Sequence, residues 1–383
     1  MPSLIDQSLL RLTIGRACAW ALLVSGWIGI AALALQFTPN FASAFALVAL
    51  WLLVLGGAAS VGTGGNMRRG VRSLAIIGCA VLAVVGLVWS VRGGGLLSVV
   101  LILFSWGALT ALASGVVRSL RLFRQALPEP PVIAATLGAL SAGLILGDLG
   151  DLSTLSTHLA IFVSILAGIL VLLQFHLEER ASAPGCRAGL FDCSLPAWPV
   201  GAWRDLEQWP LLLAGLAMLP MMASLPVMVA LCRVESIPPQ VLVLAHLVAM
   251  FGSAVLLRRW IAHWTTSMFA KLCLALLVSG AALAIWLLSP WDMLGLALTH
   301  GAAWGLAWSG QLWAPDRRGR QNASPFRAAI GYALLTIIFG VFIEGYGAKG
   351  ITFVHTLIGV LALVAWIVKD LSNIDRLIKK FKT

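Results

Sequence analysis

The feature that most constrains this chain is a repeated apolar stretch of about 20 residues, bounded by short connections that contain Gly, Pro, Asn or Asp. An α-helix rises about 1.5 Å per residue, so a stretch of this length crosses the roughly 30 Å hydrocarbon core of a bilayer. Charged residues make up only 11% of the chain, whereas soluble globular domains contain about 25%. The pattern therefore predicts an all-α integral membrane protein.

The apolar stretches predict twelve membrane-spanning helices. One connection, over residues 176–208, is long, polar and rich in proline and glycine, so it divides the spans six and six. We therefore expect an N-terminal half over residues 1–175, a central cytoplasmic loop over 176–208, a C-terminal half over 209–369 and a basic tail over 370–383. The predicted spans are residues 13–36, 40–61, 71–91, 94–116, 131–150, 154–174, 209–231, 238–257, 268–288, 290–313, 326–345 and 350–369.

The basic residues give the expected orientation. With the N-terminus in the cytoplasm and every span crossing the membrane, all 26 Lys and Arg residues except Arg92, Arg233 and Lys349 fall on the cytoplasmic side. This is the positive-inside rule, and a missed or additional span would reverse the bias in every later loop. We therefore expect both termini in the cytoplasm of a bacterial cell, with the chain embedded in the lipids of the inner membrane. The basic residues form no single patch, so no nucleic-acid partner is expected.

The two halves share a short sequence match. PVIAATLGAL, from Pro131, aligns with PFRAAIGYAL, from Pro325, and both segments open the fifth predicted span of their half. A double arginine, Arg68–Arg69 or Arg258–Arg259, also lies between the second and third spans of each half. Such self-similarity is typical of duplicated transporter folds, so we expect halves related by an axis along the membrane normal.

This organisation resembles the major facilitator superfamily in its span count, its division by a long cytoplasmic loop and its cytoplasmic termini. AHLVAMFGSAVLLRR, from Ala245, resembles an eighth span of that family, and LALTHGAAWGLAWSG, from Leu296, resembles a tenth span. The resemblance implies transport by alternating access, with the tenth span facing a central cavity. The chain departs from the family motif between spans two and three, because VGTGGNMRRGVR has no aspartate. DRRGR, at Asp316–Arg320, falls between spans ten and eleven instead.

Polar and aromatic residues within the spans are the candidates for solute binding. Ionisable groups in hydrocarbon are costly, so His246 and His300 can bind a solute or relay protons, or be neutral and hydrogen-bonded to a neighbouring helix. Trp304 and Trp308 share a helix face, and such surfaces suit an apolar or amphipathic organic solute, with ordinary helix packing as the alternative. The candidate solute-binding residues are His300, Trp304, Trp308, His246, Trp106, Ser105 and Met221.

Two carboxylates occupy equivalent places in the two halves. Asp148 and Glu344 end the fifth predicted span of each half, so they are candidates for proton coupling. The alternative is a pair of solvated helix ends in the headgroup region. His158 and His355 lie near the predicted outer ends of their spans, and we expect both at the membrane interface.

The sequence carries no motif for soluble catalysis, such as a P-loop, G-x-S-x-G or H-E-x-x-H, and its six cysteines form no zinc pattern. We therefore expect no enzyme, no catalytic residue, no cofactor and no metal. The leading prediction is a secondary active transporter of a small apolar or amphipathic organic solute, coupled to protons. One alternative is a membrane haem or metal protein that uses His246 and His300, with His158 or His355. Another is a transporter-like scaffold or assembly factor, which the missing aspartate allows. The sequence does not predict the oligomeric state.

Overall fold

The structure, a computed structural model, describes residues 4–62, 69–122, 131–145, 152–175, 205–231, 237, 239–256, 263–285, 290–313 and 325–382. In this part of the chain the regular elements are helices, and one α-helix overlaps each predicted span. The α-helices are α1 (Leu4–Phe37), α2 (Phe41–Gly62), α3 (Arg69–Val91), α4 (Gly95–Leu122), α5 (Pro131–Ile145), α6 (Leu152–Phe175), α7 (Trp209–Leu231), α8 (Pro239–Leu256), α10 (Thr266–Ile285), α11 (Pro290–Trp313), α12 (Pro325–Tyr346) and α13 (Ala348–Lys382), and a short 3-10 helix, η2 (Leu206–Gln208), precedes α7.

The described helices have the length and composition of membrane spans. Nine of them are long and apolar enough to cross a bilayer, and shorter apolar helices cover Ala135–Leu144 and Val241–Ser253. The prediction of an all-helical membrane protein is therefore confirmed for the described residues. Twelve crossings and cytoplasmic termini stay predictions.

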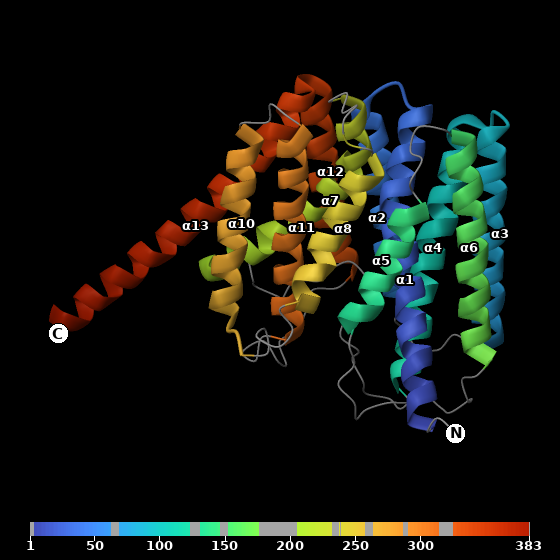
Figure 1. Cartoon of the computed structure of the whole chain (residues 1–383), viewed down its shortest axis with the longest axis horizontal. Coiled ribbons are helices and arrows are strands. Elements are labelled where there is room, and N and C mark those ends of the chain that lie inside the picture. Colours follow the sequence, from blue (N-terminus) through green and yellow to red (C-terminus); the bar gives the residue numbers. More distant parts are fainter. Residues whose placement is uncertain are drawn as a thin grey trace.

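The helices pack in two groups that follow the order of the chain. α1 to α6 pack among themselves at one side of the assembly, and α7 to α13 pack at the other (Figure 1). The groups meet where α12 runs along α2, where α8 packs against α5 and where α7 packs against α1. The α1–α2 and α12–α13 connections lie at the end of the assembly opposite the N-terminus. We call this end the outer end, in keeping with the predicted orientation.

Glycines allow the closest helix contacts. A Cβ atom at Gly301 of α11 would lie 2.6 Å from the carbonyl oxygen of His246 on α8, and a Cβ at Gly305 would collide with the carbonyl oxygen of Met250. Gly301 and Gly305 therefore form a Gly-x-x-x-Gly contact, which lets two helix backbones approach in a membrane. Gly138 of α5 meets α1 in the same way.

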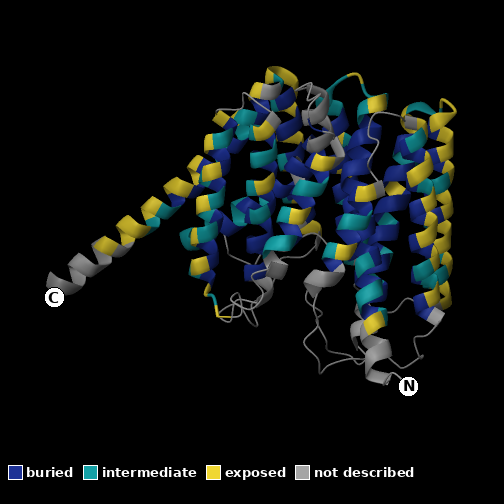
Figure 2. Ribbon diagram, in the orientation of Figure 1, coloured by how far each residue is buried: buried dark blue, intermediate teal, exposed yellow. Residues whose placement is uncertain are grey.

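The burial pattern places α1 at the centre and α3 and α13 at the edges. In α1, 94% of the apolar window is buried, against 33% in α3 and 28% in α13. Dark blue buried residues fill the middle of the assembly, and yellow exposed residues line α3 and α13 (Figure 2). Many of those exposed side chains are Val, Leu and Ile, which suits a surface that faces lipid tails.

The helix α13 continues through the predicted basic tail as far as Lys382. With 35 residues, α13 is about 52 Å long, which exceeds the thickness of the hydrocarbon core. It slants away from the assembly toward the C-terminus (Figure 1). An ion pair joins α13 to η2, because Nζ of Lys369 lies 3.4 Å from a carboxylate oxygen of Glu207. The same Nζ lies 4.1 Å from the ring centroid of Trp366 within α13.

Candidate functional site

Four aromatic side chains meet in the middle of the assembly, and we call them the aromatic cluster. Trp20 comes from α1, Phe251 from α8, and Trp304 and Trp308 from α11. The ring centroid of Trp20 lies 5.4 to 6.1 Å from those of the other three, in edge-to-face geometry. The rings of Trp304 and Trp308 are stacked 5.6 Å apart with 16° between their planes. All four side chains are buried.

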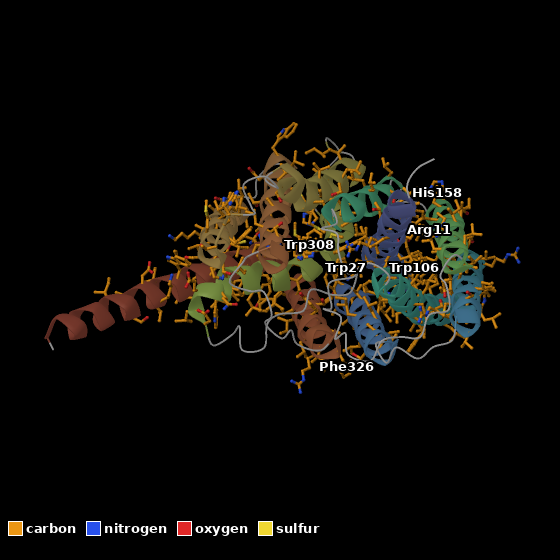
Figure 3. All side chains as sticks on the ribbon, turned by 90° about the horizontal axis from the view of Figure 1, so that it is seen from below. Arg11, Trp27, Trp106, His158, Trp308 and Phe326 are labelled. Atoms are coloured by element: carbon orange, nitrogen blue, oxygen red, sulfur yellow. The ribbon has the colours of Figure 1, made fainter. Side chains whose placement is uncertain are left out.

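The aromatic cluster joins the two helix groups. Trp20 belongs to the N-terminal group, whereas the other three rings belong to the C-terminal group, and Phe251 contacts both Trp304 and Trp308. From below, Trp308, Trp27 and Trp106 lie in the interior of the assembly, and Phe326 lies at its edge (Figure 3). Edge-to-face and offset-stacked pairs are the favourable arrangements for aromatic rings, because a ring has a negative face and a positive edge.

Sequence reasoning found Trp304 and Trp308 but missed Trp20 and Phe251. All four residues lie at comparable distances from the predicted cytoplasmic ends of their spans. Their similar depth in the membrane is a signal that could have suggested contact among these four side chains. Depth alone does not say which face of a helix a residue occupies, so the contact itself is a finding of the structure.

The other predicted solute-binding residues of the N-terminal half and of α7 pack around these helices. Trp106 donates its indole N–H to the carbonyl oxygen of Leu22 at 2.9 Å, which ties α4 to α1. Ser105 donates its hydroxyl to the carbonyl oxygen of Leu101 in its own helix at 2.7 Å. Met221 is fully buried in α7. The polar atoms of Trp106 and Ser105 are therefore already bound to backbone.

His246 is buried in α8, and its Nδ1 lies 2.7 Å from the carbonyl oxygen of Ala297 on α11. This distance requires an N–H at Nδ1 that donates to the carbonyl. The bond joins the same two helices that Gly301 brings together. Of the two roles that the sequence left open, the hydrogen bond to a neighbouring helix is the one with a direct contact.

His300 of α11 contacts His355 of α13, and we call these two residues the histidine pair. Their ring centroids lie 4.3 Å apart with 66° between the planes, and both side chains are buried. His355 therefore lies inside the protein, and its depth at the membrane interface stays a prediction. His355 is on the face of α13 that is turned into the assembly, where its ring meets His300. His158, by contrast, is exposed on α6.

A small residue makes room for the histidine pair. A Cβ atom at Gly280 of α10 would lie 3.0 Å from both Nε2 and Cδ2 of His300. The ring of His300 is therefore held between α10 and α13. None of the ring contacts of the aromatic cluster includes His300, although Trp304 follows it by one helical turn.

Of the two carboxylates predicted to couple protons, Asp148 lies outside the described residues. Glu344 is exposed at the outer end of α12, and its Oε2 accepts a hydrogen bond from the backbone N–H of Phe41 at 2.7 Å. Phe41 is the first residue of α2, and Asn40 accepts the N–H of Ser43 at the same helix end. Glu344 therefore caps a helix of the other half, where a negative charge also complements the helix dipole.

We expect replacement of Glu344 by alanine to lower the free energy of unfolding by about 1 kcal/mol, because the N–H of Phe41 loses its acceptor. Glu344→Gln keeps an acceptor oxygen and should lose less than half of that. Thermal unfolding of the purified variants, compared with the parent protein, measures the difference. Equal losses in the two variants would show that the charge matters and the hydrogen bond does not.

A bound metal or haem would need further ligands near the buried histidines. Within the described part of the chain, no group of three or more His, Cys, Asp and Glu side chains could hold a metal ion. The histidine pair supplies two imidazoles, and His246 already uses Nδ1 for the carbonyl of Ala297. The metal alternative therefore lacks a set of ligands among these residues.

Comparisons with known proteins identify the fold. The chain matches no family model and no curated protein sequence.

Several solved structures are similar to this chain over most of its length. A nucleoside transporter, NupG, in its D323A mutant form, is 14% identical with a TM-score of 0.59, covering 94% of this chain and 99% of its own. A POT family transporter in complex with a thioalcohol-conjugated peptide is 12% identical with a TM-score of 0.64, covering 95% and 96%. The human organic anion transporter MFSD10 is 15% identical with a TM-score of 0.55, covering 96% and 99%. This chain therefore has the same fold as these three solved transporter structures. Its long apolar helices are typical of a multi-pass membrane protein.

Proposed function

We propose that the chain is a secondary active transporter that moves a small apolar or amphipathic organic solute by alternating access, with proton coupling. The observation that carries this proposal is the aromatic cluster, because its rings come from both halves of a transporter fold and are buried between them. Transporter sites lie near the membrane midplane where the two repeats meet. The candidate binding residues are those predicted above, with Trp20 and Phe251 added.

The packing of the helices suits a rocking motion of two rigid halves. Within the C-terminal half, the glycine contacts and the bond between His246 and Ala297 hold α8 and α11 together. Between the halves, Trp20 touches Phe251, Trp304 and Trp308 through ring contacts. In a rocking cycle the contacts within a half persist, and the contacts between halves separate on one side of the membrane at a time.

The chemistry of the aromatic cluster indicates the class of solute. Its rings offer apolar faces and edges without a carboxylate among them. Arg16 is buried in α1 one helical turn before Trp20, so it lies on the same side of the helix. A buried guanidinium one helical turn from Trp20 in the sequence favours an amphipathic solute with a ring and an anionic group over a cation. The three similar structures are a nucleoside transporter, a POT family transporter in complex with a conjugated peptide, and an organic anion transporter.

Purified protein reconstituted in proteoliposomes tests the proposal. Under an imposed pH gradient, we expect accumulation of labelled p-aminohippurate, an aromatic organic anion, and less accumulation of the cation ethidium or of uridine. A protonophore should abolish the accumulation, and empty liposomes control for leakage. A flux of p-aminohippurate that equals the flux in empty liposomes, with the other two probes equally inactive, would contradict the proposal.

A further inference from the structure

The histidine pair contains buried polar atoms that the packing leaves without partners. Nε2 of His300 and both ring nitrogens of His355 have no hydrogen-bond partner in the described residues. A neutral imidazole has one N–H donor and one acceptor nitrogen, and buried polar groups are normally paired. Two such rings in contact, at 4.3 Å between centroids, are therefore an exception that calls for a functional explanation. Intramembrane ionisable residues mark proton relays in many transporters.

Among the described residues, no buried carboxylate is present that could compensate a positive charge on the histidine pair. His246 on α8 interacts electrostatically with both rings. The helix α7 has no charged residue in its sequence. Two other titratable residues on the neighbouring helices are buried, Cys273 in α10 and Tyr332 in α12. The remaining titratable or charged residues of these helices are Lys271 on α10, Asp292 on α11, Arg327, Glu344 and Tyr346 on α12, and Lys349, Lys369, Asp370, Asp375, Arg376, Lys379, Lys380 and Lys382 on α13.

We propose that His300 and His355 together hold the coupling proton of the transport cycle, a role that rests on the proposed function. When one ring is protonated, reorientation of the two rings lets its N–H donate to the lone pair of the other ring, so that two imidazoles share a single proton. A second proton is opposed by repulsion between like charges at this separation. The pair therefore binds one proton and releases one proton in each cycle, without a change in covalent bonds.

A chain of ring contacts connects the histidine pair to the other half of the molecule at the outer end. His355 packs on Phe339 of α12, with centroids 5.8 Å apart, and Phe339 packs on Phe45 of α2 at 5.9 Å. A Cβ atom at Gly340, the next residue, would lie only 2.5 Å from Cβ of Phe45. Together with the cap of α2 by Glu344, these contacts close the outer end between α2 and α12.

Through this connection, protonation of the histidine pair can affect whether the outer end is open or closed. In the closed packing, Nε2 of His300 and both ring nitrogens of His355 have no hydrogen-bond partner among the described residues, so the charged form is costly there. A conformation in which α12 has moved away from α2 admits water to the pair. A ligand shifts a population toward the state that binds it better. Proton binding therefore favours opening of the outer end, and proton release favours its closure.

Distance measurements by electron paramagnetic resonance test this inference without a solute. Spin labels are placed at Gln36 and Tyr346, which are exposed at the outer ends of α1 and α12, after the native cysteines are replaced by alanine. In nanodiscs, lowering the pH from about 8 to about 5, which brackets the titration of imidazole, should increase a population with a longer distance. The increase should disappear in His300→Asn and in His355→Asn, and the double variant should behave like either single variant.

Matched controls keep the result decisive. His158→Asn removes an exposed histidine of α6 and should keep the full pH response. If an asparagine variant aggregates, His300→Gln or His355→Gln is used, because its amide can occupy the place of Nε2. A pH response that survives in folded variants at both positions, or that is absent in the parent protein, overturns the inference. A histidine-dependent response in a protein that moves no solute in proteoliposomes shows instead that the proposed transport function fails.

Discussion

Replacement of Gly305 by alanine is expected to lower the free energy of unfolding by about 2 kcal/mol, because the new Cβ would collide with α8. That Cβ would overlap the carbonyl oxygen of Met250 and lie 2.5 Å from Oγ of Ser253. A backbone oxygen cannot rotate away as a flexible side chain can, so α8 and α11 must separate. Unfolding of the purified protein, followed by tryptophan fluorescence during heating, measures the loss.

Gly331→Ala is the matched control for Gly305→Ala. Gly331 is also within a helix, α12, but a Cβ atom there meets no atom within 4 Å. Alanine is a better helix former than glycine by about 1 kcal/mol, so this variant should be as stable as the parent protein or more stable. The two substitutions should thus have opposite signs. Equal melting behaviour of the two variants would mean that the contact between α8 and α11 is looser than the structure indicates.

Replacement of Trp308 by alanine is expected to lower stability by about 3–5 kcal/mol, the range for truncation of a buried tryptophan. The substitution removes one stacked contact with Trp304 and edge-to-face contacts with Trp20 and Phe251. Trp308→Phe keeps a ring and should fold. If the aromatic cluster binds the solute, the phenylalanine variant should transport p-aminohippurate with a higher KM, because a smaller ring covers less of the solute.

Trp291 provides the control for Trp308. It lies in the same helix, α11, but its side chain is 71% exposed. Trp291→Ala and Trp291→Phe should therefore leave both melting and transport close to those of the parent protein. Unchanged KM in Trp308→Phe, together with unchanged transport in the Trp291 variants, would place the solute away from the aromatic cluster.

The sequence predicted the helices well because hydropathy is a local property. The span predicted over 290–313 coincides with α11, and the span over 209–231 coincides with α7. The glycines of RGGG, predicted to interrupt the chain between two spans, form a turn between α3 and α4 in which Gly93 has φ of 90°. Side chains without glycine's freedom rarely adopt this angle. The helix α13 continues beyond the span predicted to end at residue 369, because a drop in hydropathy does not by itself end a helix.

The candidate site could be predicted only in part, because contacts depend on helix faces that hydropathy does not specify. His246 and His300 were found from their depth, but the bond of His246 to Ala297 and the contact of His300 with His355 depend on how α8, α11 and α13 are rotated. Glu344 was found as an acid at a span end, yet its partner is the N–H of Phe41, far away in the sequence. Trp20 carried no signal beyond its depth.

By itself, the sequence determined that the chain is a bundle of membrane helices, because the bilayer acts on each segment separately according to its own apolar length and flanking charge. Tertiary structure alone decided that rings of α1, α8 and α11 meet, that two histidines of α11 and α13 touch, and that an acid of α12 caps α2. These contacts follow from shape, where glycines permit close approach and large rings fill the remaining space. In a membrane the hydrophobic effect does not sort one apolar face from another, so packing and a few hydrogen bonds make that choice.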